Sequence, residues 1–324
     1  MYKFGLAMTL AALAGCSTTH EQNLKEESMS EATSVGLPAF DSLWNFDDPA
    51  GTEAKFRELL PRAQESGNQG YLAELLTQIA RTEGLQQKYT DALKTLDQAD
   101  LLIKPEMQTA RVRSRLERGR VFNSSGKPAE SVPVFKDALR LAQDAGLEFY
   151  AVDAAHMLGI ATRDNESLRW NVEAIKLAEA AKDSKARQWL GPLYNNTGWT
   201  YSDMGRYDDA LKMFEKDLMF RQERKSTSEA GVARWSIAKM LRHLGRVDQA
   251  LKIQLELLDQ PERKGNDAEG YTREEIGESL LLLGRETEAK PHFARAWELL
   301  RDDRWLRQDE PKRLERLKRL GGVK

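Results

Sequence analysis

Small residues recur along this sequence with a period of 39 or 40 positions. The period is marked by Ala80, Gly119, Gly159, Gly198, Ala238 and Gly277. Twelve positions after five of these comes another small residue, at Ala92, Ser131, Ala210, Ala250 and Ala289. Sixteen positions after four of them comes a bulky apolar residue, at Leu96, Phe135, Phe214 and Phe293. A pattern kept in phase over six units predicts a stack of similar structural repeats, each covering the apolar face of its neighbour.

Each unit is expected to be two helices joined by a tight turn. Seven positions after four of the small residues stands a glycine, at Gly126, Gly205, Gly245 and Gly284. Glycine adopts the left-handed conformation that ends a helix at little cost, so we expect it to terminate the first helix of the unit, helix A. The two small residues then let helix A and helix B approach closely, and the bulky residue fills the remaining gap. The third unit lacks the turn glycine, and its apolar pattern predicts a turn about four residues shorter.

The pattern resembles the tetratricopeptide repeat, which has the form W-x-x-L-G-x-x-Y, then A, then F. The best match is Tyr194-Asn195-Asn196-Thr197-Gly198-Trp199-Thr200-Tyr201, then Ala210 and Phe214. The resemblance covers residues from about 71 to 300 and implies an all-α, right-handed α-solenoid of about six helix-turn-helix repeats. The period is longer than the usual ~34 residues, as in the extended repeats of kinesin-light-chain-like proteins.

The sequence divides into five regions. Residues 1–15 have the charge and short apolar run of a signal peptide, and residues 16–38 are a polar segment expected to be a flexible tether. Residues 39–70 are expected to form an N-terminal capping region, residues 71–300 the repeats, and residues 301–324 a C-terminal capping helix. That last helix is strongly basic. We expect it to be a solvated cap, and a contact with anionic lipid or an acidic partner is the alternative.

The only cysteine ends the run Leu13-Ala14-Gly15-Cys16. This run resembles the lipobox of bacterial lipoprotein precursors. The resemblance implies cleavage before Cys16 and attachment of fatty acyl chains, palmitate among them, to that residue. Ser17 follows where the family's inner-membrane proteins commonly have Asp, which implies the outer membrane of the bacterial cell envelope. The alternatives are an ordinary signal peptide that ends near a cysteine, or a buried structural cysteine.

Catalytic and cofactor sites are not indicated by the sequence. It has no Walker A loop, no G-x-S-x-G and no H-E-x-x-H motif, and its four histidines fall in different segments. We therefore expect neither an enzyme nor a metal or cofactor site. The formal net charge of −2 gives no general attraction to nucleic acid, and export makes a nucleic-acid partner less favoured still.

Candidate partner-binding residues follow from the resemblance, which implies that certain helix A positions face a concave groove. They are Arg120, Asn123, Arg163, Asn195, Trp199, Trp235, Lys239 and Arg242. Cations, amides and tryptophans suit carboxylates and peptide groups, so we expect a basic, aromatic groove that binds a protein or peptide. Charge reversal at Arg120, Lys239 or Arg242 should then weaken capture without unfolding the chain. The alternative is that these are ordinary solvated helix residues, with Trp199 packed against the next repeat.

Two functions remain open at this stage. One is a membrane-anchored adaptor, facing the periplasm or the cell surface, that binds extended peptides or acidic segments of envelope proteins. The other is a permanent structural subunit of an envelope assembly or secretion machine. An open basic groove would favour the adaptor, and a groove filled by the chain's own segment would favour the subunit. An enzyme with an unrecognised site is a distant third.

Overall fold

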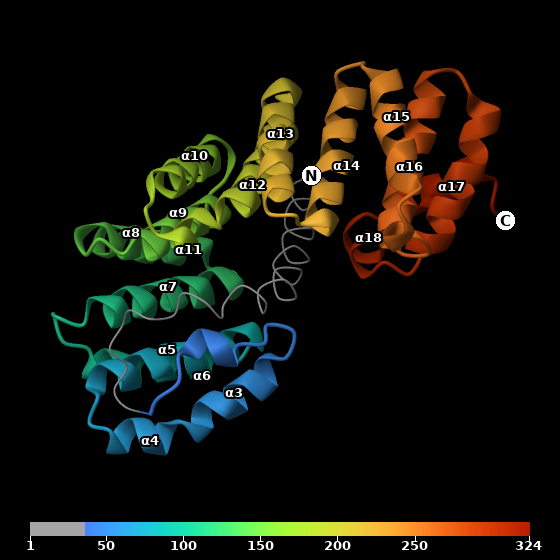
Figure 1. Cartoon of the computed structure of the whole chain (residues 1–324). Helices are drawn as coiled ribbons and strands as arrows, with labels where there is room; N and C mark the ends of the chain where they lie inside the picture. Colours follow the sequence, from blue (N-terminus) through green and yellow to red (C-terminus); the bar gives the residue numbers. More distant parts are fainter. Residues whose placement is uncertain (1–35) are drawn as a thin grey trace. The chain divides into compact units, whose positions relative to one another are not determined.

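A computed structural model describes residues 36–324 (Figure 1). The expected signal peptide of residues 1–15, Cys16 and most of the expected tether lie outside the described residues. Between residues 36 and 324, no helix combines the length and the apolar character needed to cross a membrane. The described chain forms two compact units, residues 36–193 and residues 194–324, and each is treated by itself below.

The N-terminal unit begins with a short 3-10 helix and continues as pairs of α-helices (Figure 1). Its elements are η1 (Phe40–Leu43), α3 (Pro49–Glu58), α4 (Leu60–Glu65), α5 (Gln69–Leu85), α6 (Tyr89–Leu102), α7 (Gln108–Ser124), α8 (Pro128–Asp144), α9 (Glu148–Ala161), α10 (Asp164–Ala180) and α11 (Ser184–Arg187). The A helices are α5, α7 and α9, and each packs against the B helix that follows it. The repeat pattern of the sequence therefore corresponds to successive helix pairs.

The C-terminal unit continues the same pairing, and α12 contains the boundary between the units. Its elements are α12 (Leu190–Asp203), α13 (Tyr207–Glu223), α14 (Thr227–His243), α15 (Val247–Leu258), η2 (Pro261–Arg263), α16 (Asp267–Leu282), α17 (Glu286–Leu300), α18 (Arg304–Asp309) and α19 (Pro311–Gly321). The A helices are α12, α14 and α16. The expected all-α solenoid of helix-turn-helix repeats is confirmed.

The periodic small residues lie at close contacts between helix A and helix B, as the sequence predicts. A Cβ atom built on Gly119 would lie 2.4 Å from the ring of Phe135, and one on Gly198 would lie 2.7 Å from the ring of Phe214. Both phenylalanines are fully buried. Each ring sixteen positions after the glycine thus occupies the space where a side chain on helix A would otherwise stand.

The turn glycines also have the predicted conformation. Gly126 has φ +82° and Gly205 has φ +72°. After α7, the amide of Gly126 donates to the carbonyl of Asn123 at 3.2 Å, and the amide of Lys127 donates to the carbonyl of Phe122 at 2.9 Å. These bonds satisfy carbonyl groups at the end of the helix that have no partner within it.

The third repeat has the shortened turn that its sequence predicts. Helix α10 begins at Asp164, five residues after Gly159, whereas α13 begins at Tyr207, nine residues after Gly198. Asn171 stands where the other repeats have a small residue, and a Cβ atom on Gly159 would lie 2.2 Å from its Oδ1 atom. The early start of helix B therefore leaves the close contact between the two helices in place.

The C-terminal helix α19 caps the second unit. It packs against α17 and buries Leu317 in the cluster that contains Phe293. Gly322 ends it with φ +64°. Two of its cations, Arg313 and Arg316, pair with Glu274 and with Glu278 of α16, respectively. Part of the positive charge of α19 is therefore neutralised inside the unit, and the helix is less solvated than expected, since only 14% of the Arg313 side chain is exposed.

Candidate functional site

The A helices of the N-terminal unit share a face that is crossed by ion pairs. Arg81 of α5 lies 3.1 Å from Glu117 of α7, and Arg120 of α7 lies 2.7 Å from the same carboxylate. Arg120 also donates to both carboxylate oxygens of Asp153 on α9, at 2.5 and 2.6 Å. We call this row the N-terminal ion-pair ladder: Arg81, Glu117, Arg120 and Asp153. It joins three consecutive A helices through side chains about one repeat apart.

Burial and neighbouring charges set the pKa values of Arg120 and of His156 beside it. Although burial acts to lower it, the carboxylates of Asp153 and Glu117 raise the pKa of Arg120, which therefore stays charged. Beside the ladder, burial lowers the pKa of His156 to about 4, so this imidazole is neutral at physiological pH. Its ring lies 5.1 Å from the ring of Trp189. Glu117, Asp153 and His156 are thus buried side chains that connect consecutive A helices.

A segment at the start of the described chain lies on this same face. We call residues 36–48 the strap. The guanidinium carbon of Arg81 lies 5.8 Å from the ring of Trp44 and 5.6 Å from that of Phe46, and the two rings stack with their centroids 4.6 Å apart. The indole Nε1 of Trp44 donates to Oε1 of Gln78 at 2.9 Å. The strap thus contacts the middle of α5 through two aromatic rings, and it contacts the start of α5 where the hydroxyl of Tyr71 donates to the carbonyl of Pro38 at 2.9 Å.

The strap also contacts side chains of α7 and α11. The guanidinium carbon of Arg113 lies 5.5 Å from the ring of Phe40, and its Nε donates to the hydroxyl of Tyr150 on α9 at 2.6 Å. Asp41 forms an exposed ion pair with Lys185 at 3.1 Å. The strap therefore touches side chains from successive repeats, as an extended peptide bound to the A helices would.

The C-terminal unit has a comparable arrangement on α14 and α16. Lys239 and Arg242 lie 2.9 and 2.8 Å from the carboxylate of Glu275. Although burial acts to raise the pKa of Glu275, the charges of Lys239 and Arg242 lower it to about 2. On the neighbouring residue of α16, Arg313 of α19 pairs with the carboxylate of Glu274, and its guanidinium lies over the ring of Tyr271. The two cations expected to bind a partner are thus held by an internal carboxylate.

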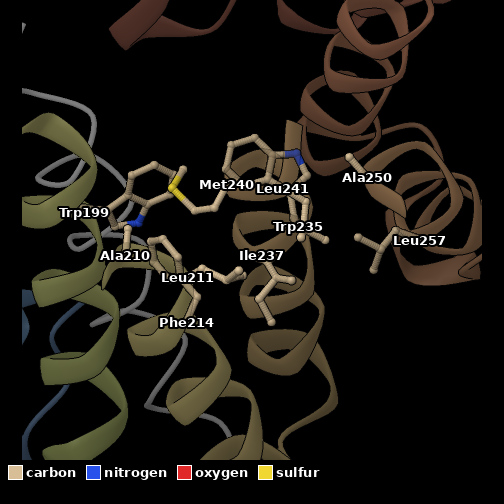
Figure 2. Packing of buried hydrophobic residues seen from close by; sticks show 10 residues of the cluster. All are labelled: Trp199, Ala210, Leu211, Phe214, Trp235, Ile237, Met240, Leu241, Ala250 and Leu257. Carbon is tan, nitrogen blue, oxygen red and sulfur yellow. The ribbon is translucent and has the colours of Figure 1, made fainter. Parts of the chain in front are cut away.

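The two candidate tryptophans belong to the core. Figure 2 shows Trp199 and Trp235 among the buried side chains of the C-terminal unit, with Phe214 and Met240 close by. Only 3% of Trp199 and 2% of Trp235 are exposed, and their rings lie 6.1 Å apart. The expectation of an exposed aromatic anchor is not met at these positions, because each ring fills space between helices of adjacent repeats.

The remaining candidates differ in exposure. Arg163 is exposed just before α10, and Asn123 is half-buried near the end of α7, one turn beyond Arg120. Asn195 is buried, and its Oδ1 atom has no hydrogen-bond partner within the described residues. Of these three candidates, Arg163 alone has an exposed side chain, and Asn123 is partly accessible.

Metal binding gains no support from the described part of the chain. Between residues 36 and 324, no three His, Cys, Asp or Glu side chains are grouped so that they could hold a metal ion. His243 stacks on Tyr207 with centroids 4.5 Å apart, and burial lowers its pKa to about 4.

Sequence reasoning missed the residues that contact the strap: Gln78, Arg81 and Arg113. Their signal is the aromatic trio Phe40, Trp44 and Phe46, which the sequence shows just before the first helix pair. Three aromatic residues so close together need apolar or cationic partners. The periodic pattern does not identify those partners, because it describes contacts within and between repeats only.

Comparisons with known proteins agree with this architecture. The sequence profile of the tetratricopeptide repeat matches residues 193–223. A signal transduction ATPase with numerous domains and a tetratricopeptide repeat sensor, from Pyrococcus horikoshii, superimposes with a TM-score of 0.66 at 13% identity, covering 84% of this chain and 44% of that chain. The present chain thus spans less than half of that ATPase.

Two further solved structures are similar. The apo form of the quorum sensor NprR from B. thuringiensis has a TM-score of 0.52 at 14% identity, covering 84% of this chain and 81% of that one. BtubC from P. vanneervenii has a TM-score of 0.50 at 14% identity, covering 69% and 94%. Comparison with curated proteins gives no match. Residues 193–223 thus match a tetratricopeptide repeat, and the described part of the chain has the all-α repeat fold of tetratricopeptide-repeat proteins.

Proposed function

We propose that this protein is a non-catalytic scaffold that binds an extended segment of another envelope protein on the A helices of its N-terminal unit. A lipid on Cys16 would hold it at the bacterial outer membrane, facing the periplasm or the cell surface. The observation that carries the binding role is the strap, since its side chains contact α5, α7 and α11 as a bound peptide would.

The side chains on the A-helix face indicate which kind of partner segment would bind there. Arg81 and Arg113 present guanidinium groups to aromatic rings, and such pairs are favourable within about 6 Å. Arg120 is neutralised by Glu117 and Asp153. A partner is therefore recognised through aromatic side chains and a few hydrogen bonds, with acidic groups in a secondary role.

A permanent structural subunit remains the second candidate, and the same strap favours it. In that case the strap never leaves the A helices, and partners contact the outer surface. The B helices offer exposed apolar side chains there: Leu101 of α6 is 88% exposed and Met219 of α13 is 62% exposed. Side chains of this kind are typical of contact sites when they form part of a larger patch.

Photo-crosslinking in intact cells separates the two candidates. A photoreactive residue replaces Asn123 near the A-helix face, and matched chains carry it at Leu101 or Met219 on the B helices. The scaffold proposal expects a crosslinked partner polypeptide from position 123 and none from positions 101 and 219. Crosslinks from the B-helix positions alone would reject it in favour of the structural subunit.

A further inference from the structure

The strap has two parts with different burial. Leu37 and Phe40 are buried, and Phe40 contacts Phe56 and Tyr71 with ring centroids 6.2 and 4.7 Å away. Beyond η1, Trp44 is only half-buried and Phe46 is 46% exposed. The first part is anchored in the core of the cap, and the second lies at its edge, where Trp44 still packs against that core and Phe46 does not.

In the surface part, the ring of Trp44 packs edge-on against Phe56 with centroids 5.4 Å apart, and the backbone of Asn45 is hydrogen-bonded to the hydroxyl of Thr52; Phe46 has neither contact. Trp44 has one hydrogen bond to Gln78, and both rings share the guanidinium of Arg81. Arg81 has a second partner in Glu117, and Glu117 is also paired with Arg120. The removal of the two rings therefore leaves every charge of the ladder paired.

The strap and the face it covers are complementary in charge. Asp41, Asp47 and Asp48 are its only charged residues, so the strap carries three negative charges and no positive one. Of these, Asp41 pairs with Lys185, whereas Asp48 accepts from the amide of Gly51 at the start of α3. The guanidinium groups of Arg81 and Arg113 meet aromatic rings of the strap. The face under the strap therefore fits a segment that combines aromatic rings with carboxylates.

We propose that Trp44 and Phe46 form a displaceable cover, and that a partner segment with two aromatic residues beside acidic ones replaces them on Gln78 and Arg81. The proposal rests on the proposed function and adds the class of partner and its regulation. Because the cover belongs to the same chain, it competes at an effective concentration of about millimolar. A free segment of equal intrinsic affinity at ~10 µM is then outcompeted about 100-fold, and a partner must bind the face better than the cover does.

The test uses the full chain and a fluorescent synthetic peptide with the sequence of residues 36–48. Fluorescence anisotropy measures its binding to the wild type and to a Trp44→Ala/Phe46→Ala variant, which keeps the buried anchor Phe40. We expect the variant to bind at least about tenfold more tightly than the wild type. Adding Arg81→Ala to the variant should abolish the gain, whereas Arg140→Ala on α8 should not. A probe peptide with alanine at both aromatic positions should not bind.

A second measurement keeps strap residue Trp44 and tests displacement directly. A photoreactive residue at position 46 should crosslink to α5, and the yield should fall as probe peptide is added up to millimolar concentration. Equal probe affinity of the wild type and the folded double variant, or a crosslink yield that the probe does not change, would overturn the cover. Neither result depends on the crosslink from position 123 in cells. The proposed binding role and the proposed cover can therefore be rejected independently of each other.

Discussion

Arg120 and Asp153 are joined by two hydrogen bonds of 2.5 and 2.6 Å although they lie 33 positions apart in the sequence. The pair links α7 to α9, and the side chains of Arg120 and Asp153 are only 18% and 7% exposed. An ion pair of this kind is sensitive to the loss of one partner, because the other is left buried with its charge uncompensated.

Charge reversal at Arg120 should therefore unfold the chain more readily. Arg120→Glu places a third carboxylate beside Asp153 and Glu117, and we expect the free energy of unfolding to fall by about 3–5 kcal/mol. Equilibrium unfolding in urea measures this change. The result would replace the expectation from sequence that this substitution affects only partner capture.

Arg140 provides the matched control. It pairs with Asp137 and Asp144 on α8, but 60% of its side chain is exposed. Water screens exposed ion pairs, which contribute little to stability, so Arg140→Glu should lower the free energy of unfolding far less than Arg120→Glu does. Equal losses in the two variants would show that the burial of the Arg120 network has no energetic consequence.

The lowered pKa of Glu275 predicts that the free energy of unfolding falls in acid. Its folded-state pKa of about 2 lies below the ordinary value of 4.5. A group with a lowered folded-state pKa contributes stability above its unfolded pKa and loses it as the pH falls through the folded value. We therefore expect the stability that Glu275 contributes at neutral pH to disappear between about pH 5 and pH 2.

The comparison with Glu275→Gln isolates this contribution. Thermal unfolding across this pH range should show the wild type losing its advantage over the variant as the solution becomes acidic. Glu298→Gln is the control, because Glu298 pairs with Arg295 at an exposed site, and its difference from the wild type should stay small. A gap between the wild type and Glu275→Gln that does not change with pH would contradict the prediction.

A substitution at Gly198 tests the close contact between α12 and α13. Gly198→Leu forces a side chain into the space of the Phe214 ring, 2.7 Å from the new Cβ. Overpacking typically costs about 1–3 kcal/mol, and more where the backbone must shift, so the melting temperature should fall sharply. Gly84→Ala is the control, because a Cβ atom there meets only Val121 at 3.5 Å. That variant should match the wild type or exceed it in stability, since alanine favours helices over glycine.

The repeat phase was predictable because it rests on side-chain size. Gly119, Gly198 and Gly277 are the positions where only hydrogen fits beside a phenylalanine ring, and size is visible in the sequence. The left-handed turns were predictable for a similar reason at Gly126 and Gly205. At Gln87, however, which occupies the same turn position in the first repeat, φ is +62° without a glycine.

The internal ion pairs were not predictable from the period alone. Lys239 and Arg242 were expected to face solvent, yet Glu275 on the next A helix neutralises both. Which cation meets which carboxylate depends on the offset between adjacent A helices, and this offset is a property of packing. The burial of Trp235 was missed for the same reason, and that of Trp199 was anticipated only as an alternative, because the pattern places both on helix A without showing how neighbouring repeats cover them.

The last prediction concerns the site of attachment. The lipobox resemblance leads us to expect that wild-type protein partitions into the membrane fraction with acyl mass added at Cys16. Cys16→Ala should remain an uncleaved precursor without that mass. The matched variant Ser17→Asp keeps the acceptor cysteine and should still be acylated, but it should move from the outer to the inner membrane. Mass spectrometry of the N-terminal peptide and density-gradient fractionation measure the two effects. If Cys16→Ala fractionates like the wild type and neither carries a lipid, then the anchor proposal fails, while the binding role of the A helices stays open to its own crosslinking test.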